Sequence, residues 1–343
     1  MPALAPAIMA AAQAEIGLVA DIGGTNARFA LARRDQAGRV HLDHCQELAA
    51  EDYASLAMCL NAYLNRLAPS LRPSQAAFGV AGPVTGDYIG LTNRDWSFSL
   101  EDLKSAFQFS RLEVINDFSA IGHAVSLLRG QDWEALPGPD WPDHLRGVVS
   151  IIGPGTGLGV SARMGNADGS EVIMASEGGH ASFAPIDSLE IEILKVMLGK
   201  FARVSNERIL SGAGLGHLFE AISQVRGRPV TSPGAPAILQ AALKGNDALA
   251  VEAVERFCLI LGSVMGDLAL VQGASAVAIA GGMAPRMSQF LNTAAVRARF
   301  EAKGRAQPLL STVPIGLIRH AQPGLIGAAN LLLSKTCVSE TIP

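Results

Sequence analysis

The sequence predicts an α/β protein with a mixed sheet, because apolar strands alternate along the chain with stretches of helical periodicity. Three of the predicted strands end in glycine-rich turns, at residues 23–25, 153–159 and 281–282. The chain has 343 residues, of which 49% are apolar and 17% charged, a composition typical of globular proteins. This length leaves room for two or three domains.

The first part of the chain, from Gly17 to about Arg129, alternates strand and helix. "LVADIGGTNARFAL" predicts two strands joined by a turn, and residues 52–67 have helical periodicity. "AAFGVAGPV" predicts a strand that ends at a Gly-Pro turn. "LEVINDFSAIGHAVSLL" begins as a strand and becomes a helix near Phe118, and the Pro-, Gly- and Asp-rich residues 130–147 predict a loop at a domain boundary.

The second part repeats this alternation. "GVVSIIGPGTGLGVSAR" predicts strand, glycine turn and strand, and helical stretches follow at residues 189–201 and 235–270. "ASAVAIAGGMAP" is a further apolar strand that ends in a Gly-Gly turn, and "GLIGAANLLLSK" predicts a closing helix. Gly24-Thr25 and Gly155-Thr156 occupy similar turns, which either chance or a duplicated nucleotide-binding hairpin would explain.

Charge and cysteine content exclude several classes of protein. The formal net charge is -4 and the lysines and arginines are scattered, so we expect no nucleic-acid or membrane partner. The four cysteines are far apart, which fits neither a zinc site nor a disulfide framework and favours the cytoplasm. Residues 1–16 have no basic residue of the kind that begins a signal peptide, so we expect a tail there. No apolar run reaches the ~20 residues that a membrane span requires.

Glycine-rich turns after apolar strands favour a polyphosphate site, because glycine allows close backbone approach and successive N–H groups bind anions. For any single turn, an ordinary tight turn is the alternative. A Walker-type sequence is absent, and "GPGTGLGV" lacks the spacing of a dinucleotide-binding loop. The esterase motif G-x-S-x-G and the zinc motif H-E-x-x-H are absent too. Asp21 is unusual, since an unpaired carboxylate at the end of an apolar strand is costly.

Six motifs in order resemble those of the bacterial glucokinase family. They are "LVADIGGTNARFAL", "VINDFSAIGHAV", "IGPGTGLGVS", "SEGGHASFAP", "NERILSGAGL" and "AIAGGMAPR", and the resemblance extends from about residue 17 to 335. It implies a two-domain actin-like ATPase (ribonuclease H-like) fold with a deep interdomain cleft. The small domain would comprise residues 17–127 with 320–337, and the large domain residues 128–319. No cysteine cluster follows His180, unlike in the related repressor-and-sugar-kinase family.

The resemblance also implies where ATP and magnesium bind. Asp21 would orient Mg²⁺ through water, so its charge would be compensated in a wet site. The alternative for Asp21 is a side chain that initiates the turn. The residues implied to bind ATP are Ala20, Asp21, Ile22, Gly23, Gly24, Thr25, Gly155, Thr156, Gly157, Gly281 and Gly282.

A second set of residues is implied to bind the sugar: Asn116, Asp117, Glu177, His180 and Glu207. Carboxylates suit a hexose because each oxygen can accept from a neighbouring hydroxyl, and Asp117 would be the general base. A helix N-cap is the plain alternative for Asn116 and Asp117, and the two roles can coexist. "EGGH" by itself is typical of a surface turn and "NERILSG" of a helix start. Asn93 fits the sugar pocket and a plain turn equally well, so it is not assigned to the site.

The implied reaction is phosphorylation of glucose by ATP to give glucose 6-phosphate and ADP. A kinase for mannose, fructose or an N-acetylhexosamine is the first alternative, since it differs only in pocket shape. A non-metabolic actin-like ATPase is the second, and it would not need Glu177, His180 and Glu207. We expect glucose and ATP as partners and a homodimer, although the sequence itself leaves the oligomeric state open.

Overall fold

The computed structural model describes residues 16–92, 94–166 and 170–334. Its contacts divide these residues into two compact units. The first unit comprises residues 16–127 with 322–334, and the second comprises residues 128–321. The predicted tail up to residue 15, Asn93 and the end of the predicted small domain at 335–337 lie outside the described residues.

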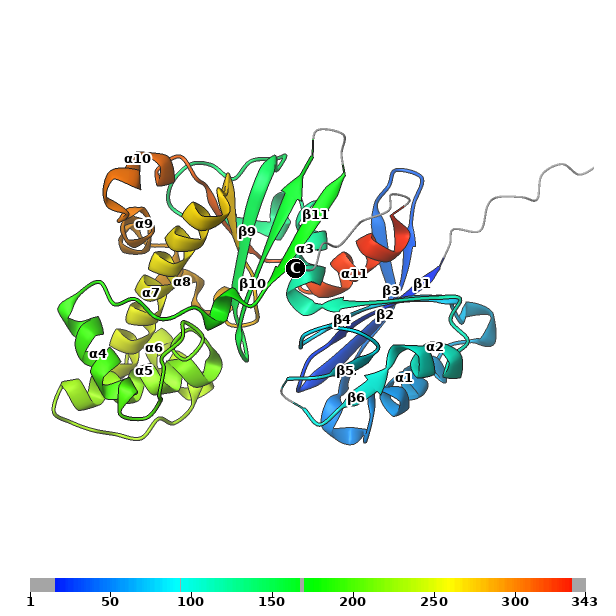
Figure 1. Ribbon diagram of the computed structural model, residues 1–343, viewed down its shortest axis with the longest axis horizontal. Helices are drawn as coiled ribbons and strands as arrows, with labels where there is room; N and C mark the ends of the chain where they lie inside the picture. Colours follow the sequence, from blue (N-terminus) through cyan, green and yellow to red (C-terminus); the bar gives the residue numbers. More distant parts are fainter. Residues whose placement is uncertain (1–15, 93, 167–169, 335–343) are drawn as a thin grey trace, which may run out of the picture. The chain divides into compact units, whose positions relative to one another are not determined.

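The first unit is built on a five-stranded mixed sheet with the order β3-β2-β1-β4-β7 (Figure 1). Strands β1, β4 and β7 are parallel neighbours, whereas β2 is antiparallel to β1, and β3 is antiparallel to β2. The strand bounds are β1 Gly17–Ile22, β2 Asn26–Arg34, β3 Val40–Ala49, β4 Gln75–Val80 and β7 Arg111–Asn116. A separate hairpin pairs β5 (Tyr88–Gly90) with β6 (Ser97–Ser99).

Helices cover both faces of this sheet, as the two-residue period of β1 requires. Leu18, Ala20 and Ile22 point to one face and pack in a cluster with α1 (Leu56–Leu64) and α2 (Leu100–Ala106). Val19 points to the other face, where it packs against α11 (Pro323–Leu333). Figure 1 shows α11 beside α3 (Asp117–Val125) on that face. The predicted closing helix is therefore part of the first unit.

The second unit contains a six-stranded mixed sheet with the order β11-β10-β9-β12-β13-β8. Its first five positions repeat the first sheet: three antiparallel strands, then two strands parallel to the innermost of them. The bounds are β8 Trp133–Ala135, β9 Gly147–Pro154, β10 Leu158–Gly165, β11 Glu171–Ser176, β12 Ala276–Ile279 and β13 Ile315–Ile318. The hairpins β1–β2 and β9–β10 thus occupy equivalent positions, and the prediction of a mixed α/β architecture is confirmed.

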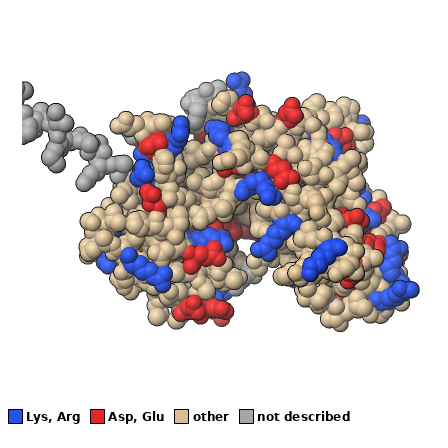
Figure 2. All heavy atoms as spheres, turned by 180° about the vertical axis from the view of Figure 1, so that it is seen from behind, with Lys and Arg blue, Asp and Glu red and all other residues tan. Residues whose placement is uncertain are grey.

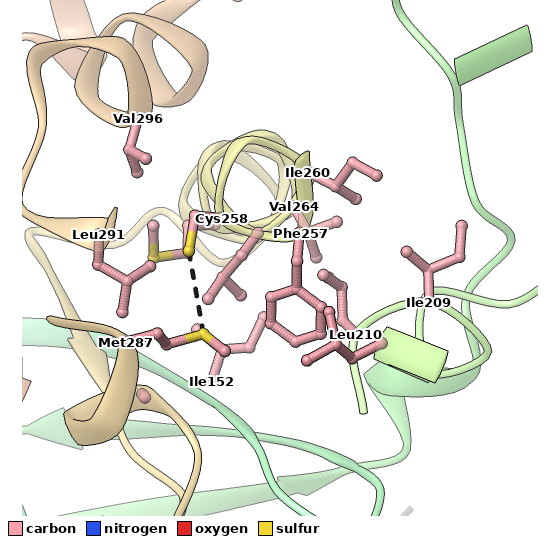
Figure 3. Packing of buried hydrophobic residues seen from close by; sticks show 14 of the residues in the cluster. Ile152, Ile209, Leu210, Phe257, Cys258, Ile260, Val264, Met287, Leu291 and Val296 are labelled. Carbon is pink, nitrogen blue, oxygen red and sulfur yellow. Dashed lines mark hydrogen bonds between the residues drawn. The ribbon is translucent and has the colours of Figure 1, made fainter. Parts of the chain in front are cut away.

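The core of the second unit surrounds the long helix α7. Phe257 and Cys258 of α7 pack with Ile152 of β9, and the Cys258 Sγ lies 3.9 Å from the Met287 Sδ (Figure 3). Burial raises the pKa of the Cys258 thiol, which fits a packing role. The helices are α4 Ser188–Leu198, α5 Gly212–Val225, α6 Ala235–Lys244, α7 Ala248–Gln272, α8 Ser288–Leu291, α9 Ala294–Glu301 and α10 Gln307–Leu310.

Several predicted bounds differ from the structure for local reasons. The helix predicted at 52–67 is α1, shortened because Ser55 caps it through the Met58 N–H. The stretch 235–270 is two helices, since Gly245 ends α6 in the left-handed conformation. The predicted loop 130–147 contains the short strand β8, which pairs with β13.

The surface mixes charges of both signs. On the face drawn in Figure 2, Lys and Arg side chains are interspersed with Asp and Glu side chains. No helix within the described ranges combines the length and the apolar character that crossing a membrane requires.

Candidate active site

The first glycine turn joins β1 to β2 and is held by backbone hydrogen bonds. The Gly23 N–H donates to the Asn26 carbonyl at 2.9 Å, and the Ala50 N–H donates to the Thr25 carbonyl at 2.8 Å. The side chains of Ala20 and Ile22 are fully buried in the core, so these two residues offer a ligand only their backbone. Gly23 and Gly24 are half-buried and Thr25 is exposed, which leaves the turn open to a ligand.

Asp21 lies beside this turn and is paired with a cation. Its Oδ2 is 3.5 Å from the Arg28 Nη1 on the neighbouring strand, and Arg28 in turn donates to Glu47 at 2.8 Å. The Asp21 side chain is 24% exposed. Burial raises the pKa of Asp21, and Arg28 offsets part of that rise. A Cβ placed at Gly324 of α11 would lie 2.9 Å from the Asp21 Cγ, so a glycine there leaves room for the carboxylate.

In proteins Mg²⁺ keeps several water ligands and is bound through one or two carboxylates plus substrate phosphates. The single carboxylate of Asp21 fits this pattern. Among the described residues no group of three or more His, Cys, Asp or Glu side chains could hold a metal ion. Asp21 at the first glycine turn supplies one such carboxylate.

Asn116 and Asp117 stand where β7 becomes α3. The Asn116 Oδ1 accepts from the Phe118 N–H at 2.8 Å, so Asn116 is the N-cap, and its Nδ2 donates to the Gly82 carbonyl at 3.2 Å. Asp117 is the first residue of the helix, and its Oδ1 also accepts from the Phe118 N–H. Of the two residues for which a helix cap was the alternative, Asn116 is therefore the N-cap, and Asp117 follows it inside the helix.

Strand register brings this pair to the same edge of the sheet as the first glycine turn. Ile22 of β1 pairs with Val80 of β4, and Val80 pairs with Asn116 of β7. The three parallel strands therefore end level with one another. Ligands of open α/β sheets bind beyond the carboxyl ends of strands, and both parts of the predicted chemistry in this unit lie there.

The second and third glycine turns meet in the second unit. Ile152 of β9 pairs with Ile279 of β12, so the turns that follow both strands share one sheet edge. Gly281 has φ +84°, and a Cβ there would lie 2.5 Å from the Pro154 carbonyl oxygen. Gly155 donates to the Gly157 carbonyl at 2.8 Å, and the carbonyl of Gly155 accepts from Gly212 at the start of α5. Thr156 at the tip is exposed.

The three sugar candidates of the second unit are also brought together. The His180 Nε2 lies 3.8 Å from a Glu177 carboxylate oxygen, and the His180 Nδ1 lies 4.0 Å from the Glu207 Oε1. Glu177 and His180 are exposed, at 70% and 55% of their side chains, whereas Glu207 is 32% exposed. The His180 imidazole thus has a carboxylate acceptor on each side. Such a polar, solvent-facing group is suited to binding hydroxyl groups.

Backbone pairing fixes these side chains. The Glu207 N–H donates to the Gly179 carbonyl at 2.9 Å, and the Asn206 N–H donates to the Ala181 carbonyl at 2.8 Å. Arg203 donates to the His180 carbonyl at 2.7 Å. The segments that carry "SEGGH" and "NER" thus lie side by side, and an antiparallel bridge joins Ser182 to Ser205 beside them. The turn of "SEGGH" is therefore held against a second segment, and "NERILSG" leads into α5, as its motif suggests.

Comparison with known proteins identifies the family. A family model described as Glucokinase matches residues 18–335. The glucokinase of Zymomonas mobilis subsp. mobilis is 40% identical over 315 residues, which cover 92% of this chain and 97% of that protein. The chain belongs to the glucokinase family.

Solved structures agree on the fold. A glucokinase from an Antarctic psychrotroph has a TM-score of 0.82 and 35% identity, covering 93% of this chain and 99% of its own. A ROK family glucokinase from Streptomyces griseus, in complex with glucose and AMPPNP, has a TM-score of 0.61 and 21% identity, with coverage of 92% and 99%. At that identity the second likeness concerns the fold alone, the two-domain actin-like ATPase fold of these glucokinases.

Sequence reasoning did not assign several residues that shape the site. Arg28, Gly324 and Arg203 were not assigned, although Arg28 and Gly324 lie inside quoted motifs. α5 was not among the predicted helical stretches, although "NERILSG" by itself is typical of a helix start. Ser211, a common N-cap residue, caps the helix through the Gly214 N–H at 3.0 Å.

Proposed function

We propose that this member of the glucokinase family transfers the γ-phosphoryl group of ATP to the 6-hydroxyl of glucose. One observation carries the chemistry: the first glycine turn and the Asn116–Asp117 pair lie at the same edge of one sheet. Phosphoryl transfer requires mainly positioning and charge stabilisation, and a carboxylate near bound phosphates can supply the base. We also propose that the two units are the two domains of the family fold.

In this proposal Asp117 is the general base. The sugar O6 forms a bond to the γ-phosphorus while the bond from that phosphorus to the β–γ bridging oxygen breaks, and ADP leaves. The O6 proton passes to the Asp117 carboxylate. The ATP phosphates are bound by the three glycine turns, through residues 20–25, 155–157 and 281–282. Asp21 would hold Mg²⁺ through water, and the bound metal would neutralise phosphate charge.

Sugar recognition is assigned to Asn116, Asp117, Glu177, His180 and Glu207. The grouping of Glu177, His180 and Glu207 supports this assignment, because a hexose presents several hydroxyls that each need a partner. The same grouping weighs against an actin-like ATPase without a sugar substrate, which has no use for it. The homodimer, the cytoplasmic location and the lack of a nucleic-acid or membrane partner stay predictions.

The test is ADP release by the purified protein across a panel of hexoses, with a control without sugar. Glucose should give the highest kcat/KM, and fructose and N-acetylglucosamine should be lower by ~10²-fold or more, because they leave polar groups of the site unpaired. Equal or better rates with an N-acetylated sugar would make this a different sugar kinase. ADP release that no sugar stimulates would overturn the kinase proposal.

A further inference from the structure

The Glu207 carboxylate faces two parts of the proposed site at once. Its Oε2 accepts a hydrogen bond from the Leu158 N–H at 2.9 Å, within the hairpin that carries the second glycine turn. Its Oε1 lies 4.0 Å from the His180 Nδ1, on the side of the sugar candidates. A single side chain therefore links the strand end at the phosphate turn to the predicted sugar site.

Gly157 is the residue that makes room for this link. A Cβ placed at Gly157 would lie 2.5 Å from the Glu207 Oε2, closer than non-bonded atoms approach. The neighbouring Gly155 is different, because a Cβ placed there would meet no protein atom within 4 Å. Neither glycine has a positive φ, so an alanine at either position meets no backbone strain of that kind.

A second contact ties the same segments together. A Cβ at Gly179 would overlap the Leu158 carbonyl oxygen, so the turn that holds Glu177 and His180 packs directly on the hairpin. The Glu207 N–H donates to the Gly179 carbonyl at 2.9 Å. Glu207 is thus held by its backbone to the sugar turn and by its side chain to the phosphate hairpin.

We infer that Glu207 couples the sugar site to the phosphate hairpin, with Gly157 as the positioning residue that sets where the Glu207 carboxylate lies. This inference rests on the proposed function, and it adds that a change in the hairpin alters sugar affinity even when no nucleotide is present. The physical reason is that a side chain at position 157 would push the Glu207 carboxylate away from the Leu158 N–H. The carboxylate would then lose a charge-assisted hydrogen bond and would no longer lie where it can bind the sugar.

The deciding experiment compares Gly157→Ala with the matched control Gly155→Ala, by calorimetric titration of glucose without nucleotide. Gly157→Ala should weaken glucose binding by about 10- to 100-fold, the effect of losing hydrogen bonds to a charged group. Gly155→Ala should stay within about twofold of wild type, since its methyl group meets no protein atom. Circular dichroism before titration shows whether each variant is folded.

Variants of Glu207 test the link from the other side and keep the inference testable if Gly157→Ala does not fold. Glu207→Gln retains one acceptor for the Leu158 N–H, so AMPPNP affinity without sugar should stay near wild type while glucose binding weakens. Glu207→Ala removes that acceptor and should weaken AMPPNP binding about tenfold. Glu177→Ala, on the other side of His180, should weaken glucose binding only.

The outcomes separate the inference from the proposed function. Wild-type protein that fails to bind glucose would overturn the proposed function and this inference with it. Glucose binding by wild type that is unchanged in folded Gly157→Ala would overturn the coupling alone. AMPPNP affinity that is unchanged in Glu207→Ala would do the same, because the hairpin would then not depend on the carboxylate.

Discussion

At the start of α3, two neighbouring polar residues have different surroundings although either could cap a helix. Asn116 has the extended backbone of an N-cap, and its Oδ1 accepts from the N–H groups of Phe118 and Ser119. Asp117 is already inside the helix, as its first residue. Because the cap is supplied by Asn116, helix capping does not explain the carboxylate at position 117.

Asp117→Asn tests the role of that carboxylate. Asparagine keeps the shape and most hydrogen bonds of aspartate but cannot accept the O6 proton as a base. We expect kcat to fall by roughly 10²–10⁴-fold while glucose affinity stays within about tenfold of wild type. Steady-state kinetics and glucose titration check the two halves of this expectation.

The matched control is Asp102→Asn, which removes an exposed acid from the first turn of α2. It should change neither kcat nor glucose affinity. Near-wild-type turnover in Asp117→Asn would exclude Asp117 as the base and leave the side chain with a structural role at the helix start.

Residue by residue, the family resemblance selected Glu177, His180 and Glu207 as sugar-binding candidates but did not indicate how they are connected. The three side chains lie close together, and their role in sugar binding stays a prediction. The hydrogen bond from the Leu158 N–H to Glu207 joins residues 49 positions apart in the sequence. Local patterns such as capping and turn signals do not reach that far, so this contact could only come from the folded chain.

At the scale of elements, the first unit depends on a close crossing of α3 and α11. A Cβ placed at Gly327 of α11 would overlap the Ala120 carbonyl of α3. Leu325 and Leu332 of the same helix are buried against the sheet. The glycine therefore sets the distance between α11 and the helix that begins with Asp117.

Gly327→Ala is the test of this crossing, and two effects of opposite sign compete in it. In an isolated helix, alanine is favoured over glycine by about 1 kcal/mol. Overpacking against α3 should cost about 1–3 kcal/mol and shift the start of α3. We expect a lower melting temperature and a lower kcat, measured by thermal unfolding and by steady-state kinetics.

The control for this variant is Gly90→Ala in β5, where a Cβ would meet no atom within 4 Å. It should leave kcat near wild type. A melting temperature that rises in Gly327→Ala would mean that helix propensity outweighs the contact, and the close crossing would then have no energetic importance.

Element predictions from the sequence succeeded where one signal dominated. Apolar strands followed by glycine turns were found at β1, β9 and β12, since both the strand and its end are marked. The edge strands β3 and β11 were not predicted. The exposed residues of β3 are mostly polar, and neither strand is a continuous apolar run, so their pairing to β2 and β10 supplies what the local sequence does not indicate.

At the scale of the whole molecule, the same strand order serves both units, and the chain closes the first unit only with its last described helix. The sequence indicated this repetition through two similar Gly-Thr turns, and it left chance as an alternative. The structure adds that the two turns join corresponding strands, β1 to β2 in one sheet and β9 to β10 in the other. The turns themselves could be predicted from the local sequence. That they occupy equivalent positions in the two sheets becomes visible only when all the strand pairings are known.

The larger of the two units is also held together by charge. Asp187 and the buried Glu190 of α4 pair with Arg256 of α7 and Arg299 of α9. Burial raises the pKa of Asp187, but the hydrogen bond from the Glu190 N–H and the two guanidinium groups outweigh it, so the pKa lies below its ordinary value. A carboxyl whose pKa is lowered by folding stabilises the fold above its unfolded pKa, and that contribution is lost as the pH falls through its folded pKa.

Asp187→Asn should therefore lower the melting temperature in a pH-dependent way. Asparagine still caps α4, so the change removes the negative charge together with the hydrogen bonds that the Asp187 Oδ2 accepts from Arg256 and Arg299. At pH 7 we expect a decrease of roughly 2–4 °C, a modest value because Asp187 is about one-third exposed and solvent screens part of the attraction. The difference from wild type should narrow as the pH drops below about 4, where aspartates begin to protonate in the unfolded chain.

Asp43→Asn, which breaks an exposed pair with Arg33, is the control and should change little. Thermal unfolding of the three proteins between pH 7 and pH 3 decides the point. A difference that stays constant over this range would show that the charge of Asp187 contributes nothing to stability.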